Sequence, residues 1–239
     1  MGHHDYKVVE VFGPTLQGEG PDVGMPTMFV RFGGCDYRCI WCDSMHAVDP
    51  AKIKAIQDTW SPEDIFYGLE ERCKGFRSVV LSGGNPCIWD LQPLMDLLRI
   101  RWYVAVETQG TIFRPWLNQV DRIIVSPKPP SSGMNQDPEE VFQFVRKLTE
   151  EAQKRVVFKV VVFDTKDILY ALNIGNFQSD TKLFISVGTK PTDSRDELLK
   201  RYENTWLILR NHLLPFKHAS EIQILPQMHV LLWGHKQGV

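Results

Sequence analysis

The chain has 239 residues, of which 27 are basic and 29 acidic, so its formal net charge is −2. That length suffices for a hydrophobic core without disulfides or structural metals. The balanced charge gives no attraction to nucleic acid, and no apolar run reaches the roughly 20 residues that span a bilayer. Because the five cysteines are odd in number and no signal peptide opens the chain, we expect a cytoplasmic protein with reduced thiols and no nucleic-acid or membrane partner.

Short runs of β-branched residues alternate with amphipathic segments of helical length. The segment 61–74 opens with the pattern of a capping box, with a cap-like Ser61, Pro62 next and Asp64 at the third position. We leave residues 1–7 out of the fold. The elements predicted after them are strands 8–12 and 27–32, helix 61–74, strand 78–81, helix 91–101, strands 103–106 and 122–125, helix 138–153, strand 156–163, helix 166–174, strand 183–187, helix 194–214 and strand 221–225. Such alternation predicts parallel crossovers, hence an α/β fold with either an open doubly wound sheet or a complete or partial barrel. Since no long linker interrupts the series, we predict a single domain over residues 1–239.

Three cysteines are crowded into the stretch GCDYRCIWCD, as Cys35, Cys39 and Cys42. They could be packing residues on one face of a helix, but the glycines and Asp36 in this stretch are poor helix formers. A structural zinc site with His46 as the fourth ligand is a second interpretation. The third is an iron–sulfur cluster, in which three thiolates leave one iron without a protein ligand and open to a reactant.

The spacing C-x-x-x-C-x-x-C after a strand and a glycine-rich turn resembles the signature of the radical S-adenosylmethionine superfamily. In that superfamily, the amino and carboxylate groups of S-adenosylmethionine chelate the open iron of a [4Fe-4S] cluster. Six stretches in order, FGPTLQGEG, MFVRFGGCDYRCIWCDS, LSGGNP, ETQGT, SPKPPSS and LPQMHVLLWGHKQGV, resemble the 7-carboxy-7-deazaguanine synthase family, particularly its Bacillus-type members. The resemblance covers both termini and the middle of the chain.

This resemblance implies a partial (β/α) TIM-like barrel with a trimmed core and a lyase activity in queuosine and other deazapurine biosynthesis. The substrate would be 6-carboxy-5,6,7,8-tetrahydropterin, converted to 7-carboxy-7-deazaguanine with loss of ammonia. It further implies a Mg²⁺ requirement, a 5′-deoxyadenosyl radical that removes a substrate hydrogen and later returns one, an electron donor such as flavodoxin, and a homodimer. Two alternatives stay open: an activating enzyme for glycyl-radical enzymes, and a non-enzymatic structural zinc module.

The resemblance also assigns residues to the cofactors. The cluster ligands are the three crowded cysteines, and the residues expected around S-adenosylmethionine are Trp41, Asp43, Gly84, Glu107, Ser126, Pro127, Lys128 and Ser186. The two glycines of LSGGNP would let backbone polar groups approach the methionine end of the cofactor. Asn85 stands where the superfamily usually has Glu, and Ser186 stands where many relatives have Gln.

The remaining assignments concern the substrate and magnesium. Arg31 ends a predicted strand, and its guanidinium suits the pterin carboxylate, although a surface ion pair is the alternative. Ser44 is the expected Mg²⁺ ligand, and one hydroxyl suffices only if substrate oxygens complete the site. The other expected substrate residues are Leu16, Gln17, Gly18, Ser82, His229 and the C-terminal carboxylate of Val239.

Overall fold

The computed structural model describes residues 5–73, 75–177, 180, 182–213, 221–236 and 238. Their eight strands form one sheet whose order follows the sequence from β1 to β8. β1 (Val8–Leu16) pairs antiparallel with β2 (Pro26–Phe32), and every later pair of neighbours is parallel. The other strands are β3 (Ser78–Gly83), β4 (Tyr103–Thr108), β5 (Arg122–Val125), β6 (Val156–Val162), β7 (Leu183–Val187) and β8 (Ile222–Pro226). Each of them contains or overlaps a predicted strand.

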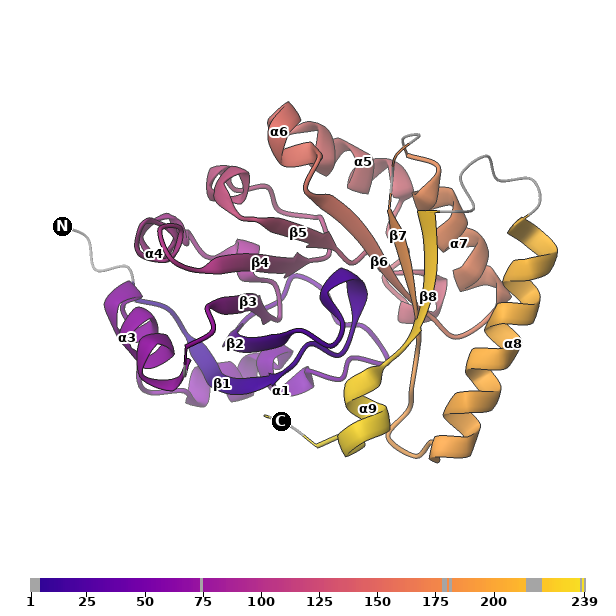
Figure 1. The fold of residues 1–239 in the computed structure, drawn as a ribbon, viewed down its shortest axis with the longest axis horizontal. Coiled ribbons are helices and arrows are strands. Elements are labelled where there is room, and N and C mark those ends of the chain that lie inside the picture. The colour runs from indigo at the N-terminus through magenta and orange to yellow at the C-terminus, as the bar shows by residue number, and fades with distance from the viewer. Residues whose placement is uncertain are drawn as a thin grey trace.

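The strand order decides between the two predicted architectures. A doubly wound sheet reverses its order at a switch point, but this order never reverses. The longer helices lie around the outside of the curved sheet (Figure 1), namely α3 (Pro62–Arg72), α4 (Gln92–Leu98), α5 (Pro138–Arg146), α7 (Thr165–Gly175) and α8 (Arg195–Leu213). Within the described residues β1 and β8 are the two edges of the sheet and do not pair with each other. The fold is therefore a partial (β/α) barrel, as the resemblance implied.

Residues alternate along each parallel strand between the helix layer and the inside of the barrel. In β3, Val79 and Leu81 join the large core beneath the helices, whereas Val80 joins a small inner cluster. That inner cluster takes one buried residue from each of five neighbouring strands: Val80, Ala105, Ile124, Val157 and Phe184. Two positions further along each strand, the same face carries a polar residue: Ser82, Glu107, Ser126, Lys159 and Ser186. The alternation thus produces a polar layer at the carboxyl ends of the strands.

The helix predicted over 138–153 is wrong as a single element. Two helices replace it, α5 and the short α6 (Glu150–Gln153). The break occurs because Thr149 adopts an extended backbone, and its side chain accepts a hydrogen bond from the Ala152 N–H. Thr149 is therefore the N-cap of a new helix. By contrast, the capping box predicted at the start of 61–74 is confirmed, with Ser61 and Asp64 each bonded to the other's backbone N–H.

Several segments had no prediction. They include three short α-helices, α1 (Met45–Val48), α2 (Pro50–Ala55) and α9 (Met228–Trp233), and four 3₁₀ turns, η1 (Gly20–Asp22), η2 (Pro86–Ile88), η3 (Pro115–Gln119) and η4 (Pro130–Ser132). Residues 5–7 also belong to the fold, although the sequence analysis left them out. Tyr6 is 2% exposed and packs edge-on against Phe32 and Trp89. None of the helices in the described residues combines the length and apolar character needed to cross a bilayer.

Candidate active site

The three crowded cysteines lie on the loop between β2 and α1, which we call the cluster loop (residues 33–44). All three are free thiols. The loop is turned tightly, because the Cys42 N–H donates to the Cys39 carbonyl over 3.2 Å and the Tyr37 N–H donates to the Cys35 thiol over 3.4 Å. Since the loop continues from a strand of the barrel, it carries the thiols to the polar carboxyl end of the sheet.

Burial controls the protonation of these thiols. It raises the pKa of Cys35 and of Cys39, and for Cys42 burial together with the charge of Asp43 raises the pKa to about 11. The charge of Lys128 acts in the opposite direction at all three sites. Without metal the thiols therefore hold their protons at neutral pH, and binding an iron–sulfur cluster must release them.

The donor set suits a cluster better than a single metal ion. Among the described residues, no group of three His, Cys, Asp or Glu side chains is arranged around one ion-sized point. A cubane cluster does not need that arrangement, because each thiolate binds a different iron. His46, the fourth ligand in the zinc interpretation, has its Nε2 atom 3.3 Å from Glu10 Oε1. A second fitting feature is Ser186, whose buried Oγ has no hydrogen-bond partner in the described part of the chain and so leaves an acceptor or donor for a bound group.

The LSGGNP loop packs directly on the cluster loop. The Gly84 N–H donates to the Phe32 carbonyl over 3.0 Å, and the Asn85 N–H donates to the Gly34 carbonyl over 2.7 Å. A Cβ atom at Gly84 would stand 2.1 Å from Gly34 O and 2.9 Å from Cys35 Cβ. The close backbone approach that we expected toward the cofactor is thus made, in this structure, between the two loops.

Asn85 is committed to internal hydrogen bonds. It is fully buried, and its amide nitrogen donates to Asp36 Oδ1 over 2.8 Å. Its amide oxygen accepts from the Cys87 N–H and from the Thr108 hydroxyl. Gln109 donates to the same Asp36 oxygen over 2.5 Å. Where the superfamily usually has Glu, this chain therefore uses Asn to hold the Asp36 carboxylate beside the first cysteine. Asp36 is a residue that the motif comparison did not single out.

Trp41 is held by the loop that follows β5. Its indole N–H donates to Ser131 Oγ over 3.0 Å, and its ring lies 5.4 Å from that of Phe163. Lys128 places its ammonium 6.0 Å from the Trp41 ring centroid and donates to Ser126 Oγ over 3.0 Å. The loop of residues 126–132 and the cluster loop thus meet, as their predicted shared role requires. Pro127 belongs to the same loop.

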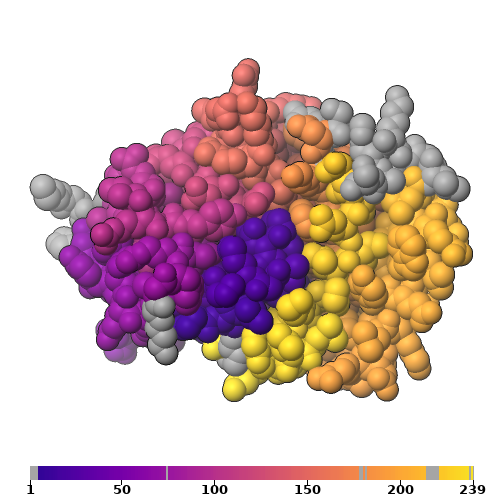
Figure 2. All heavy atoms as spheres, viewed as in Figure 1, coloured from indigo at the N-terminus to yellow at the C-terminus, as the bar shows by residue number. Residues whose placement is uncertain are grey.

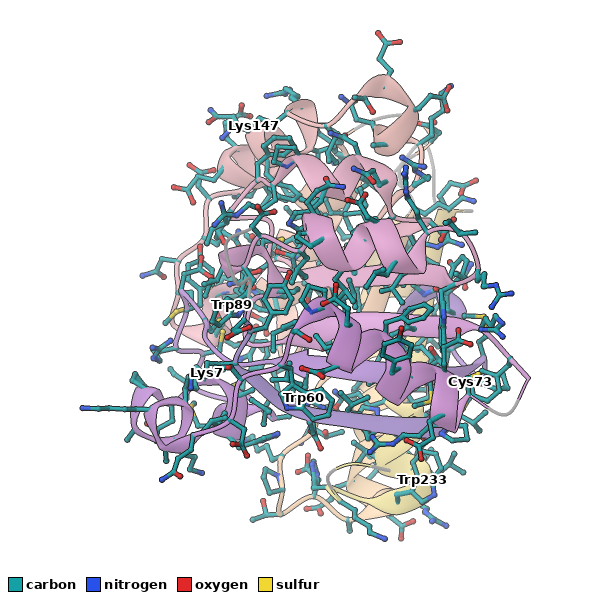
Figure 3. The ribbon with its side chains drawn as sticks, turned by 90° about the vertical axis from the view of Figure 1, so that its left-hand side faces the viewer. Lys7, Trp60, Cys73, Trp89, Lys147 and Trp233 are labelled. Atoms are coloured by element: carbon teal, nitrogen blue, oxygen red, sulfur yellow. The ribbon has the colours of Figure 1, made fainter. Side chains whose placement is uncertain are left out.

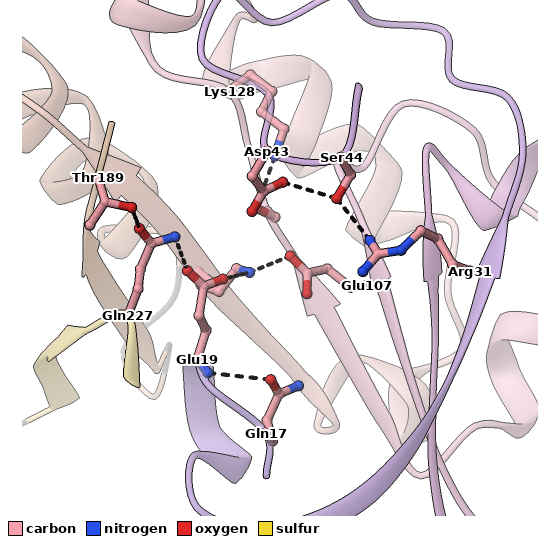
Figure 4. Close-up of polar contacts among 11 residues, drawn as sticks. Gln17, Glu19, Arg31, Asp43, Ser44, Glu107, Lys128, Thr189 and Gln227 are labelled. Atoms are coloured by element: carbon pink, nitrogen blue, oxygen red, sulfur yellow. Dashed lines mark hydrogen bonds and ion pairs between the residues drawn. The ribbon is translucent and has the colours of Figure 1, made fainter. Parts of the chain in front are cut away.

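Arg31 links the cluster loop to the inner face of β2 (Figure 4). Its Nη1 donates to Ser44 Oγ over 2.8 Å, and Ser44 donates to Asp43 Oδ1 over 3.0 Å. Its Nε atom lies 2.6 Å from Glu10 Oε1, so the ion pair that was the alternative interpretation is present. The same guanidinium nevertheless remains beside the expected magnesium ligand and can serve both contacts.

A second residue that the sequence analysis missed is Lys159. Its ammonium forms ion pairs with Glu107, an expected cofactor residue, and with Glu19 Oε2 at 2.5 Å. Glu19 follows Gln17 and Gly18 in the LQGEG turn, and its N–H donates to the Gln17 side chain over 3.3 Å. A lone lysine in the apolar run VVFKVVV, at an inward position, was the signal that could have identified it.

The LQGEG turn also meets the C-terminal segment. Figure 2 shows the N-terminal residues and the C-terminal residues side by side on one face of the molecule. The Met228 N–H donates to the Gly18 carbonyl over 2.9 Å, and a Cβ atom at Gly18 would stand 2.3 Å from His229 Nδ1. Two expected substrate residues, Gly18 and His229, are therefore brought into contact. Val239 lies outside the described residues. Leu16 is half-buried at the start of the LQGEG turn, and Ser82 is half-buried in the polar layer of the barrel.

Replacing Gly18 by alanine should disturb this contact. The added Cβ would also stand 2.9 Å from His229 Cβ, so rotating the ring cannot remove the clash and α9 must shift. We expect the apparent pterin affinity to fall about 10-fold or more, with a smaller effect on S-adenosylmethionine, when the two KM values are measured separately. The clash should also lower the thermal stability of Gly18→Ala, and the double variant Gly18→Ala/His229→Ala should regain part of that loss. An unchanged pterin KM in Gly18→Ala would contradict the close packing.

Comparison with known proteins gives consistent results. No protein-family model matches the chain. It is 40% identical to 7-carboxy-7-deazaguanine synthase of Bacillus cereus, with 97% of this chain and 98% of that protein aligned, and 37% identical to the Bacillus subtilis enzyme over 97% and 98%. The crystal structure of QueE from Escherichia coli matches with a TM-score of 0.66 at 24% identity, over 95% of this chain and 96% of that chain, which supports the fold alone. The chain belongs to the 7-carboxy-7-deazaguanine synthase family.

Proposed function

We propose that this enzyme converts 6-carboxy-5,6,7,8-tetrahydropterin to 7-carboxy-7-deazaguanine with release of ammonia, in the biosynthesis of queuosine and related deazapurines. The observation that carries the proposal is the near-complete alignment, at 40% identity, with a protein named for this product. The polar layer inside the barrel supports it, because its five inward polar side chains lie toward the carboxyl ends of the strands, the end at which the loop bearing the three thiols leaves β2. This composition is suited to a small polar substrate next to a metallocofactor.

The cofactors of the proposed reaction are a [4Fe-4S] cluster and S-adenosylmethionine. Cys35, Cys39 and Cys42 would hold the cluster, and the buried Ser186 hydroxyl together with the loop of residues 126–128 would contact S-adenosylmethionine. When bound, the pair supplies a one-electron cleavage that yields a radical able to remove hydrogen from the substrate. The protein orients the reactants and excludes side reactions. Trp41, half-buried between Ser131 and Phe163, provides a flat apolar surface for an adenine.

The substrate would bind between Arg31 and the LQGEG turn. The guanidinium offers donors to the pterin carboxylate, while the LQGEG turn at residues 16–18 would contact the flat pyrimidine edge of the substrate. Arg31 is 16% exposed in its side chain, so an ion pair with substrate would form in a partly desolvated environment. A one-electron donor such as flavodoxin and a second copy of the chain complete the proposed partners.

Substituting Arg31 by lysine should weaken pterin binding. Lysine keeps the charge but loses the planar fork, so it cannot keep the contact to Glu10 while it also binds a carboxylate. We expect the pterin KM to rise roughly 10- to 100-fold, the equivalent of one charged hydrogen bond. Arg72→Lys is the matched control, since Arg72 is exposed and donates to a backbone carbonyl, that of Val11. Equal effects of the two substitutions would contradict the assignment.

Magnesium should bind tightly only with the pterin present. Ser44 Oγ already accepts from the Arg31 guanidinium, a cation that disfavours a second cation at the same oxygen. A substrate carboxylate would draw Arg31 away and add oxygen ligands, which Mg²⁺ requires. Titrating Mg²⁺ calorimetrically into the cluster-loaded protein should give clear binding with 6-carboxypterin and weak binding without it, and Ser44→Ala should reduce the former. Equally tight binding without pterin would contradict this proposal.

The proposed reaction is tested by anaerobic incubation of the reconstituted protein with the carboxypterin, S-adenosylmethionine, reductant and Mg²⁺. Formation of 7-carboxy-7-deazaguanine and ammonia is the expected result. Metal and sulfide analysis of the anaerobically purified protein belongs to the same experiment. Zinc without acid-labile sulfide, or a cluster-loaded protein that yields no product, would overturn the proposal.

A further inference from the structure

Lys159 is a deeply buried charged side chain that the proposed reaction does not use. It lies on β6 and is 3% exposed, in the inward position two residues after Val157. Its ammonium contacts two carboxylates from distant parts of the chain, Glu19 of the LQGEG turn and Glu107 at the end of β4. One cation therefore joins the expected substrate side of the site to the expected cofactor side.

The charges of this group stabilise one another. Burial alone would lower the pKa of Lys159, but the carboxylates of Glu107 and Glu19 outweigh it and raise that pKa. Burial would likewise raise the pKa of Glu19, but the charge of Lys159 prevails and lowers it to about 2. Lys159 and Glu19 are thus both ionised at neutral pH. Because a buried ion left without its partner is costly, separating either carboxylate from the Lys159 ammonium would destabilise the site.

The hydrogen-bond network around Glu19 extends to Gln227, directly after β8 (Figure 4). Glu19 Oε1 accepts from the Gln227 side-chain amide over 2.5 Å, and Gln227 Oε1 accepts from Thr189 Oγ1 over 2.5 Å. Gln227 immediately precedes α9, which packs on Gly18. Movement of the LQGEG turn is therefore opposed by the ion pair from Lys159 on β6 and by the segments that follow β7 and β8.

We propose that Lys159 is a positioning residue that ties the pterin-binding turn at residues 16–19 to the cofactor-facing carboxylate of Glu107, so that pterin and S-adenosylmethionine bind with positive coupling. This inference rests on the proposed function, which places the two ligands on opposite sides of the ammonium. A ligand that fixes either carboxylate also fixes Lys159 and, through it, the other carboxylate. The second ligand then meets a site that has already been ordered.

The test is the affinity for S-adenosylmethionine of the cluster-loaded protein without reductant, measured by equilibrium dialysis with and without saturating 6-carboxypterin. In the unsubstituted protein, pterin should tighten the binding of S-adenosylmethionine at least 5-fold. In Lys159→Met, both ligands should still bind, but pterin should change the affinity less than 2-fold. The exposed Lys154, paired with Glu151, provides the matched control Lys154→Met, in which the coupling should persist.

A second variant keeps the test decisive where Lys159→Met does not fold. Glu19→Gln leaves the ion pair between Lys159 and Glu107 but removes the charged link to the turn, so it should also abolish the coupling. Coupling that persists in Glu19→Gln, or weaker binding of both ligands with an unchanged ratio in Lys159→Met, would overturn the inference. So would binding of both ligands without coupling in the unsubstituted protein. If the unsubstituted protein bound neither ligand, the proposed function would fail instead.

Discussion

Replacing Cys35 by alanine should abolish assembly of the iron–sulfur cluster and, with it, all measurable turnover. Three thiols are the whole set available on the cluster loop, and two cannot retain a cubane whose fourth iron has no protein ligand. The effect should be visible before any activity assay. After anaerobic reconstitution, the variant should lack both the iron and the acid-labile sulfide that the unsubstituted protein incorporates.

The matched control is Cys73→Ala. Cys73 is 4% exposed and ends α3, where its thiol lies 3.4 Å from the Glu70 carbonyl. Figure 3 shows it on the opposite side of the view from Trp89, whose indole donates to the carbonyl of Gly33 in the cluster loop. Cys73→Ala should cost about 1 kcal/mol of stability and leave the iron and sulfide content unchanged. Loss of the cluster in both variants would mean that the ligand set is wrong.

Replacing Gly84 by alanine should separate the LSGGNP loop from the cluster loop. The new methyl would overlap the backbone oxygen of Gly34, which cannot rotate away as a side chain could. The hydrogen bond from Asn85 N to Gly34 O, at 2.7 Å, would then be lost along with the Cys35 position. We expect a loss of about 3 kcal/mol in the free energy of unfolding and a large drop in cluster content. Urea unfolding and iron analysis measure the two effects.

Gly68→Ala is the control for that substitution. Gly68 lies within α3, and a Cβ atom there would meet Trp60 at 3.6 Å, an ordinary contact. Alanine should therefore stabilise the protein by roughly 0.5 to 1 kcal/mol, because it is the better helix former. A Gly84→Ala protein as stable and as rich in cluster as Gly68→Ala would contradict the packing of the two loops.

Much of the fold could be predicted because local patterns agree with it. Every strand was found from its β-branched run, and the start of α3 from Ser61 and Asp64. The break at Thr149 escaped, because a threonine inside an amphipathic segment looks the same whether it continues a helix or caps a new one. Burial of Tyr6 escaped as well, since it depends on contacts with Phe32 and Trp89, far away in sequence.

The candidate site was predictable to the extent that its residues sit at strand ends within short motifs. The meeting of Arg31 with Ser44 and of Gly18 with His229 follows from predictions made separately for each residue. Two features depend on tertiary packing and could not be read from motifs. These are the Asp36 carboxylate held by Asn85, and Lys159, whose partners lie 140 and 52 positions away in the chain.

In the proposed reaction, three thiolates suffice because S-adenosylmethionine takes the fourth coordination position of the cluster and is regenerated. The most direct test is the ratio of 7-carboxy-7-deazaguanine formed to S-adenosylmethionine consumed, measured anaerobically with the reduced, reconstituted protein and limiting S-adenosylmethionine. We expect many molecules of 7-carboxy-7-deazaguanine for each molecule of S-adenosylmethionine consumed, and no product without S-adenosylmethionine. A ratio of one or less, or equal product formation without S-adenosylmethionine, would contradict the proposed reaction.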